Sequence, residues 1–370
     1  MGKQVGTPRF YVDMPSFLHA TGQLGWDAGG AGAELLYMNC ANPYIVTVDN
    51  PILLTPFAIG ANSTNPPKTS FPVNFCALLN HNLGSNSNEF KVVGKEGIQE
   101  QNTAIDLIPN QEVLNSNHTG AFIDPQYNGT TIFTFSDADG ADKYWRSFSI
   151  YYDGDNNIDA GTHQLGSFVV GKYWDAPNAP DLKLTMSRRF DGIKQQKTIG
   201  GKTLSNIYYD GATEWTMNHP NNGTYKYPPF ELDTTANVDT AGFRFDYRAK
   251  SGLGRKGLRS WNLTFSYIDD SDMWMDNEIS SKLINDSIND DIAGGNPTGG
   301  SDANPMLSDD SFNFVWNCTL GGTLPFIFQP DKTNNNADQF AICTFKNKSL
   351  NVRQVASNVY SLSITIDEVA

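Results

Sequence analysis

Residues 259–270 read RSWNLTFSYIDD, and this stretch indicates the fold more clearly than any other part of the chain. Large apolar and aromatic side chains occupy every second position, namely Trp261, Leu263, Phe265 and Tyr267. Small polar side chains occupy the positions between them, namely Asn262, Thr264 and Ser266. Because successive side chains of a strand point to opposite faces, this alternation predicts a β-strand with one face against a core.

Similar short apolar or alternating runs recur along the chain, with turn residues between them. They lie at 44–48, 52–60, 75–83, 131–135, 145–154, 167–174, 182–190, 311–322, 325–330, 340–346 and 359–369. Each run predicts a strand. No segment keeps the i, i+3, i+4, i+7 spacing of an amphipathic helix beyond three turns. The best candidate for a short helix is NEISSKLINDSI, which begins at Asn277.

The composition agrees with a β-rich protein. The chain has 370 residues, of which 39% are hydrophobic, 12% aromatic and only 18% charged. Few charges and many aromatic and small polar residues favour sheets joined by polar loops over a helical bundle. We therefore expect a mostly β protein with a Gly-rich N-terminal arm at 1–40 and two β-sandwich-like domains at 41–165 and 166–370. The second domain is expected to carry a loop insertion at 198–240 and a flexible loop at 285–310.

Charge and cysteine content restrict the partners. The formal net charge of −14 argues against binding nucleic acid or an anionic membrane surface. The sequence has no signal peptide and no apolar run of about 18 residues, so we expect neither secretion nor a membrane span. Four cysteines lie far apart: Cys40, Cys76, Cys318 and Cys343. Three of them lie in apolar runs, which predicts buried free thiols.

One segment has the spacing of a calcium loop. In DGDNNID, oxygen-bearing side chains occur at every second residue, namely Asp153, Asp155, Asn157 and Asp159. An EF-hand loop also needs Gly at its sixth position and Glu at its twelfth, where this chain has Ile158 and Gln164. The competing interpretation is a hairpin turn, so calcium is a weak candidate here, and no other cofactor is expected.

The sequence does not predict an enzyme. It has no GxSxG nucleophile elbow and no phosphate-binding loop. His81 lies where an apolar run meets a turn, and we expect it to fix that turn by donating to a backbone carbonyl. A pair of carboxylates for glycoside cleavage is not apparent either.

Subunit contacts are the preferred role for several residues. Aromatic side chains of the expected arm have no strand pattern to bury them, which predicts an interface formed by Phe10, Tyr11, Phe17 and Trp26. The basic turn at Arg255 and Lys256, near Lys250 and Arg259, could meet an acidic surface of a neighbour or of another copy, and the competing interpretation is a solvated turn. The last run, VYSLSITIDEV, could lie at a sheet edge and pair across subunits unless it is covered.

Two stretches resemble tail-associated proteins of tailed phages, many of them marine. The first is a Gly-Gly turn followed by the 259–270 strand, and its matching residues are Gly200, Gly201, Arg259, Trp261, Leu263, Phe265, Tyr267 and Asp269. The second is similar to the end of minor-tail and distal-tail proteins, with matching residues Pro325, Phe326, Phe328, Phe340, Ala341, Phe345, Glu368 and Val369. The likeness covers about 170 residues after Gly166, and its motifs are packing motifs.

The resemblance implies a structural component of a phage virion, in particular a tail or baseplate protein that forms a homo-oligomeric ring. Its partners would be other virion proteins, and it would assemble in the host cytoplasm. Two placements remain as alternatives: a receptor-binding fibre and a head-neck or capsid-associated protein. The fibre alternative implies binding to a host surface glycan through the loop that holds Tyr208, Tyr209 and Trp215. A hydrolase is the least supported class.

Overall fold

The structure is a computed structural model. It describes residues 5–21, 33–36, 44–45, 52–54, 71–81, 83, 90–96, 104–106, 112–113, 117–119, 122–124, 128–134, 144–152, 164–189, 193–207, 217–218, 232–233, 244–245, 258–275, 310–336 and 339–369. Everything below concerns these residues.

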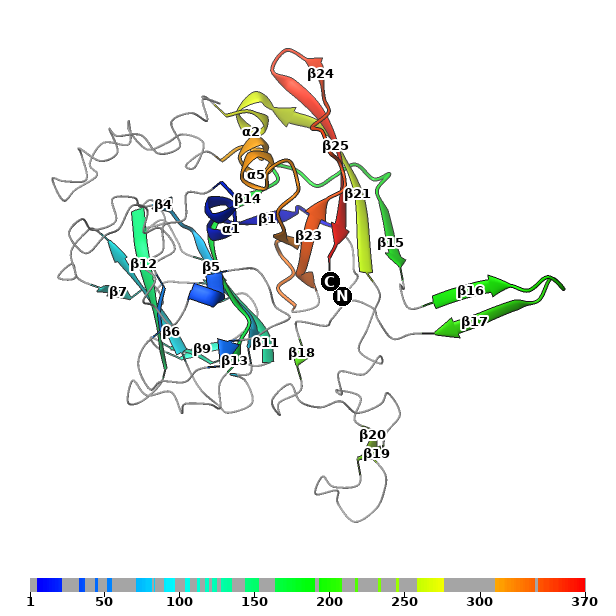
Figure 1. Cartoon of the computed structure of the whole chain (residues 1–370). Helices are drawn as coiled ribbons and strands as arrows, with labels where there is room; N and C mark the ends of the chain where they lie inside the picture. Colours follow the sequence, from blue (N-terminus) through cyan, green and yellow to red (C-terminus); the bar gives the residue numbers. More distant parts are fainter. Residues whose placement is uncertain are drawn as a thin grey trace.

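A long antiparallel sheet forms the centre of the molecule (Figure 1). Its strands follow the order β15 (Thr185–Arg189), β21 (Leu258–Asp269), β25 (Val359–Glu368), β23 (Ala341–Phe345), β22 (Phe326–Gln329), β1 (Arg9–Asp13), β14 (Ser167–Asp175), β5 (Phe75–His81), β11 (Asn128–Thr134) and β18 (Met217–Asn218). Two further strands pair at its sides, β24 (Val352–Ala356) with β25 and β8 (Glu112–Val113) with β11.

A second antiparallel sheet lies beside the first. Its order is β3 (Ile52–Leu54), β12 (Tyr144–Tyr152), β6 (Phe90–Glu96), β10 (Phe122–Asp124) and β9 (Asn117–Thr119), with β4 (Phe71–Pro72) on β12 and β7 (Ala104–Asp106) on β6. Three two-stranded ribbons complete the strands: β2 (Tyr44–Ile45) with β13 (Gln164–Leu165), β16 (Ile193–Lys197) with β17 (Thr203–Ile207), and β19 (Leu232–Asp233) with β20 (Arg244–Phe245).

Helices are few and short. They are α1 (Met14–Ala20), the 3-10 turn η1 (Ala33–Leu36), α2 (Asp270–Met273) and α5 (Phe312–Cys318). The prediction of a mostly β protein is therefore confirmed. Within the described ranges, no helix has the length and apolar character needed to cross a membrane.

The core lies on both faces of the long sheet. On one face a large apolar cluster draws side chains from both sheets, including Phe148 of β12 and Phe168 of β14. Phe10 lies in this cluster among the rings of Trp174, Phe326 and Phe328, with centroids 5.1–5.8 Å away. A smaller cluster on the opposite face contains Tyr11, Phe75, Ala77, Leu79, Ile132, Val169, Ile327, Phe340 and Ile342.

Residues 9–20 do not belong to an arm, so that prediction is wrong for them. Strand β1 pairs with β14 on one side and with β22 on the other, and α1 follows it directly. Phe10, Tyr11 and Phe17 are at most 1% exposed within the same chain, so they are core residues and not subunit contacts. A central strand with both faces covered has a continuous apolar sequence. For this reason residues 10–12 of β1, FYV, show no alternation.

The expected boundary between residues 165 and 166 does not interrupt the long sheet. Strand β14 begins just after it and pairs with β5, which lies in the first expected unit. The large apolar cluster also contains residues from both sides of the boundary.

Three local predictions are corrected by the structure. Residues 312–318 form helix α5 and not a strand, because Phe312 and Val315, and Phe314 and Cys318, share the buried side at helical spacing. Strand β25 lies inside the sheet between β21 and β23, so it is not an edge strand.

The third correction concerns β21. Trp261, Leu263 and Phe265 do face the core, but the register of β21 against β25 shifts between Phe265 and Ile268. This bulge buries Ile268 and turns Tyr267, which is 74% exposed, toward solvent.

Candidate functional site

Several predicted site residues lie outside the described residues. They are the calcium candidates Asp153, Asp155, Asn157 and Asp159, the interface residues Trp26, Arg255 and Lys256, the loop aromatics Tyr208, Tyr209 and Trp215, and Cys40. The expected loops at 198–240 and 285–310 and the expected helix near Asn277 also fall largely or wholly outside them. In the ranges that the structure does describe, no three His, Cys, Asp or Glu side chains form a group able to hold a metal ion.

His81 is a buried structural residue at the end of β5. Its Nε2 lies 2.9 Å from Thr131 Oγ1, and its Nδ1 accepts a hydrogen bond from the backbone N–H of Leu83 at 3.3 Å. Burial lowers the pKa of His81 to about 3, so the ring stays neutral. The prediction that His81 fixes a turn is confirmed, although it does so by accepting from a backbone N–H instead of donating to a carbonyl.

The three described cysteines are free and buried, as the sequence predicts. Cys76, Cys318 and Cys343 are at most 1% exposed, and burial raises the pKa of each thiol. A protonated and inaccessible thiol is a poor nucleophile, so these residues serve packing.

Asp13 is a buried carboxyl at the start of α1. It accepts a hydrogen bond from the Ser16 hydroxyl, while its Oδ1 has no hydrogen-bond partner among the described residues. Burial raises the pKa of Asp13 to about 7. A shifted carboxyl can mark a reaction centre, yet Asp13 is only 3% exposed, which leaves it without access to a substrate.

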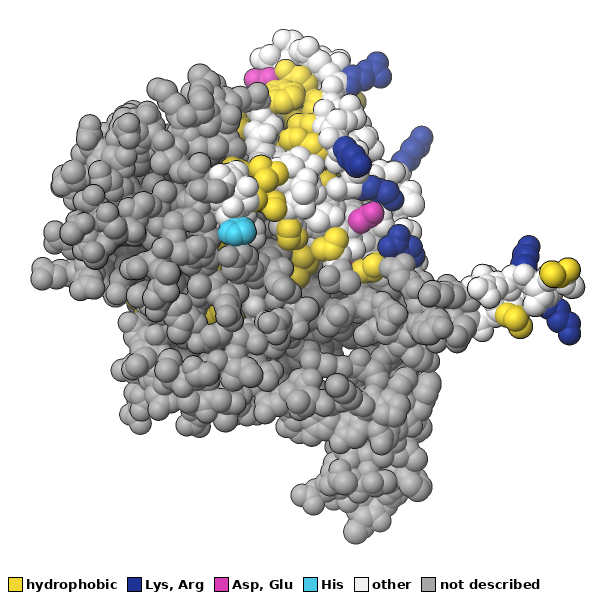
Figure 2. Space-filling model, in the orientation of Figure 1, with side chains coloured by type: hydrophobic (Ala, Val, Ile, Leu, Met, Phe, Trp, Pro, Cys, Tyr) yellow, Lys and Arg dark blue, Asp and Glu magenta, His cyan; other side chains and the backbone are white. Residues whose placement is uncertain are grey.

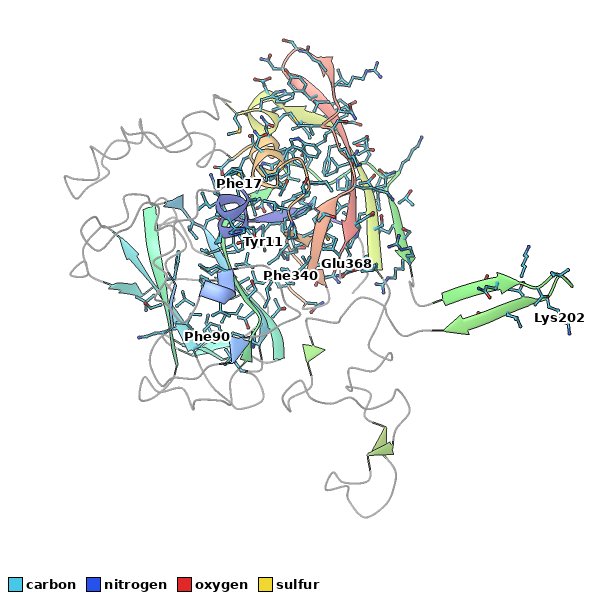
Figure 3. The ribbon with its side chains drawn as sticks, viewed as in Figure 1. Tyr11, Phe17, Phe90, Lys202, Phe340 and Glu368 are labelled. Carbon is cyan, nitrogen blue, oxygen red and sulfur yellow. The ribbon has the colours of Figure 1, made fainter. Side chains whose placement is uncertain are left out.

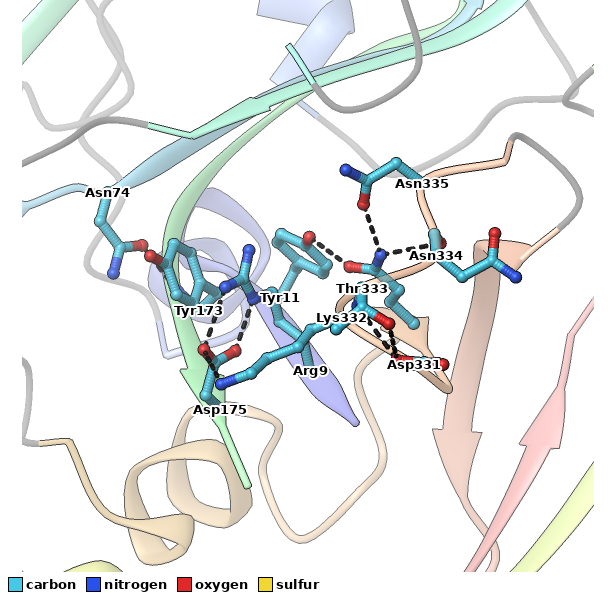
Figure 4. A network of polar contacts seen from close by, with 11 residues as sticks. Arg9, Tyr11, Asn74, Tyr173, Asp175, Asp331, Lys332, Thr333, Asn334 and Asn335 are labelled. Carbon is cyan, nitrogen blue, oxygen red and sulfur yellow. Dashed lines mark hydrogen bonds and ion pairs between the residues drawn. The ribbon is translucent and has the colours of Figure 1, made fainter. Parts of the chain in front are cut away.

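A polar network joins β1, β14 and the turn after β22 (Figure 4). Arg9 donates to Asp175, its partner in the β1–β14 register, and Lys332 donates to the same carboxylate at 3.1 Å. The Arg9 guanidinium also lies 4.0 Å from the centre of the Tyr173 ring. These contacts hold neighbouring strands in register. The charged groups are paired with one another, as expected of a structural cross-link.

The same network continues through a buried tyrosine. The Tyr11 hydroxyl donates to Gln329 Oε1 at 2.8 Å, and Gln329 Nε2 donates to the Asn334 carbonyl at 3.1 Å and to Asn335 Oδ1 at 3.0 Å. Burial raises the pKa of Tyr11 well above its usual value. A neutral phenol with a fixed partner stabilises the turn at 331–336 and supplies no base.

Arg259 is committed to its own chain. Its guanidinium meets Glu368 with two hydrogen bonds of 2.9 Å and donates to the Phe340 carbonyl at 2.8 Å. The side chains of Arg259 and Glu368 are 14% and 8% exposed, so the pair is nearly buried. Arg259 therefore locks β21 to the end of β25 and does not offer a free charge to a neighbour.

The surface is unusual in one segment. Seven large hydrophobic side chains are exposed among the described residues, and four of them fall within residues 182–204: Leu182, Met186, Ile199 and Leu204. These residues belong to the edge strand β15, the turn before it and the β16–β17 hairpin. We call this segment, residues 182–207, the assembly edge. Exposed apolar side chains on an edge strand and on a projecting hairpin are typical of interaction surfaces.

Strand β15 ends the long sheet. It pairs with β21 on one side, and no described strand pairs with its other side. All five of its residues are exposed, including Met186 and Arg188. Charged side chains on an edge strand discourage unspecific pairing, while the backbone groups stay available to a specific partner.

The β16–β17 hairpin stands away from the rest of the molecule (Figure 1). Residues 195–205 are exposed without exception, and Lys202 lies at the tip (Figure 3). In the space-filling view the hairpin carries hydrophobic and basic side chains side by side (Figure 2). The tip of this hairpin falls within the insertion at 198–240, for which the sequence predicts a surface loop and not a hairpin. The signal that was available is IKQQKTIGGKTLSNI, with three lysines, no acidic residue and a Gly-Gly turn.

Comparison with known proteins gives no relatives: no family model, no curated protein and no solved structure matches the chain.

Proposed function

We propose that this protein is a structural subunit that assembles with further copies of itself through the assembly edge. The main observation in support is that four large hydrophobic side chains are exposed at one edge strand and one projecting hairpin, namely Leu182, Met186, Ile199 and Leu204. Leaving apolar area in water costs about 25 cal/mol per Å², and contact with a neighbour removes that cost.

The particle in which we place the subunit follows from the resemblance. Tail-associated phage proteins suggest a tail or baseplate component of a virion, with a ring as the assembled form. An open sheet edge and a projecting hairpin support this proposal, because each would bind a different surface of the next copy. Such head-to-tail contacts form a ring when the rotation between neighbouring copies closes.

Sedimentation velocity on the purified chain tests self-assembly. Between about 1 and 100 µM, a range over which contacts of ordinary strength are populated, the weight-average sedimentation coefficient should rise. Negative-stain electron microscopy of the heavy fraction should then show closed rings of uniform size. A chain that sediments as a monomer throughout would refute the proposal.

The virion assignment has its own test. Quantitative mass spectrometry of purified particles of the virus that encodes this chain should find it in a fixed copy number per particle. Its absence from washed particles would contradict the virion assignment and leave self-assembly to be judged by sedimentation.

A further inference from the structure

Among the described residues, the β16–β17 hairpin pairs with no other strand and adds no side chain to a buried cluster. It is a separate two-stranded ribbon, paired only within itself from Ile193↔Ile207 to Lys197↔Thr203. Ile199 is 110% exposed and Leu204 is 60% exposed. A lone two-stranded ribbon is marginally stable in water, so this one gains from any surface that covers it.

The tip is nevertheless well ordered by its own hydrogen bonds. Gly201 N–H donates to the Thr198 carbonyl at 2.9 Å, which closes a tight turn, and the positive φ of 78° at Gly201 suits glycine. Thr198 N–H donates to the Lys202 carbonyl at 2.8 Å, and the Thr198 hydroxyl accepts from Lys202 N–H at 3.1 Å. The turn thus presents Ile199 in a fixed position, and a preorganised tip loses less entropy when it binds.

The charge of the hairpin is opposite to that of the chain. Residues 193–207 hold three lysines and no acidic residue, so they contribute +3 to a net charge of −14 and leave −17 for the rest. Lys197 and Lys202 are exposed, and neither forms an ion pair in the part of the chain that is described. The most suitable partner is therefore an acidic protein surface, and every further copy of this chain supplies one.

The acidic turn after β21 lies far from the hairpin within one copy. The hairpin follows Arg189, which pairs with Leu258 at the start of β21. The acidic turn of Asp269, Asp270 and α2 lies at the other end of β21, after twelve strand residues or roughly 40 Å at about 3.3 Å per residue. Figure 1 shows α2 and the hairpin at these separate places. The acidic turn of the same copy therefore lies away from the hairpin, whereas the exposed Asp269 and Asp270 of a second copy are open to it.

We infer that the β16–β17 hairpin is a clasp that docks, through Ile199 and the flanking Lys197 and Lys202, on the acidic surface of a second copy of this chain. This inference rests on the proposed self-assembly and names the contact that produces it. The contact is heterologous, because a basic hairpin on one copy meets a different, acidic surface on the next.

Two hairpin variants and one control test the clasp. The first variant is Ile199→Ser, which removes the apolar contact, and the second is Lys197→Glu with Lys202→Glu, which reverses the charge. The control is Arg353→Glu with Val355→Ser, the same kinds of change at exposed positions of β24, a strand that pairs with the long sheet. All the altered side chains are exposed, so far-UV circular dichroism and the melting temperature should match the wild type.

Sedimentation velocity should show at least tenfold weaker association for both hairpin variants and unchanged association for the control. Raising NaCl from 50 to 500 mM should weaken association of the wild type and of Ile199→Ser, because both keep the lysines. The charge-reversed variant should lose this weakening by salt. If all variants assemble as the wild type does, the clasp is refuted while self-assembly stands.

Two other results would also overturn the clasp. A wild type that remains monomeric refutes it together with the proposed function. The second is that the monomer binds a fluorescent 20-nucleotide DNA and that Lys197→Glu with Lys202→Glu abolishes this binding. Such a result would assign the basic hairpin to nucleic acid.

Discussion

Asp13→Asn should stabilise the protein at pH 8 and leave its stability nearly unchanged at pH 3. Asp13 is 3% exposed, its Oδ1 has no hydrogen-bond partner among the described residues, and burial raises its pKa from 3.8 to about 7. The folded state therefore keeps a proton on this carboxyl at pH values where the unfolded chain has released it.

The sign and size of the effect follow from this difference. Between pH 4 and 7 the folded state binds more protons than the unfolded state, so the contribution of Asp13 to stability falls as pH rises. One pKa unit corresponds to about 1.4 kcal/mol, and a shift of about three units therefore gives about 4 kcal/mol at pH 8. Asparagine is neutral at every pH, has nearly the same shape and keeps an oxygen that can accept from Ser16.

The assay is denaturation by urea at pH 3, 5, 7 and 8, followed by tryptophan fluorescence at a concentration where the chain is monomeric. The difference in free energy of unfolding, variant minus wild type, should grow with pH from near zero and level off above pH 7. The comparison at pH 3 is an internal control, because Asp13 is protonated there in both the folded and the unfolded state. A difference that does not change with pH, or a variant less stable at pH 8, would refute the reasoning.

Two further pairs of substitutions test the sheet. In Gly171→Ala the new Cβ would lie 2.1 Å from the Val12 carbonyl oxygen, so urea denaturation should show a free energy of unfolding lower by about 3 kcal/mol or more. In Gly201→Ala the new Cβ would have no atom within 4 Å, so only the positive φ should lower the free energy of unfolding, by about 1 kcal/mol. Equal losses in the two variants would contradict this packing. Arg259→Met should lower the free energy of unfolding by about 3 kcal/mol, because it leaves Glu368 buried without its partner. Adding Glu368→Gln should recover part of that loss. A double variant no more stable than the single one would show that the pair is not coupled.

The strands that could be predicted from the sequence are those with one core-facing side. Strand β21 and strand β25 alternate because their outer faces are solvated, and both were identified. Strand β1 was not predicted, because Phe10 and Tyr11 are buried on opposite faces of the sheet and no alternation marks the strand. Helix α5 was mistaken for a strand because Phe312, Phe314 and Trp316 alternate in sequence, although the buried positions follow a helical spacing.

Sheet order was beyond local patterns for a physical reason. Strand β1 pairs with β14 and β22, which come about 160 and 320 residues later in the chain. The end position of β25 in the chain likewise said nothing about its place between β21 and β23. Such pairings are decided by how long-range apolar faces fit together, and they place Arg259 against Glu368 instead of against a neighbouring subunit.

The candidate surface could be anticipated only in part. The Gly-Gly turn and the lysines around it are visible in the sequence, but a polar excursion and a projecting ribbon have the same composition. The structure separates them by showing residues 195–205 fully exposed.

The separation of core and hairpin gives the strongest reason to assign the hairpin to a partner. Phe10, Tyr11 and Phe17, which the sequence offered as an interface, are buried inside the chain, and Phe10 alone meets the rings of Trp174, Phe326 and Phe328. Ile199 has no such use, since it contacts no buried cluster and lies at the tip of a ribbon held by its own turn. Folding does not require an isoleucine there, because serine would fit the same exposed position. A second copy that covers the tip does require an apolar side chain, and the lysines beside it match the acidic charge of that copy.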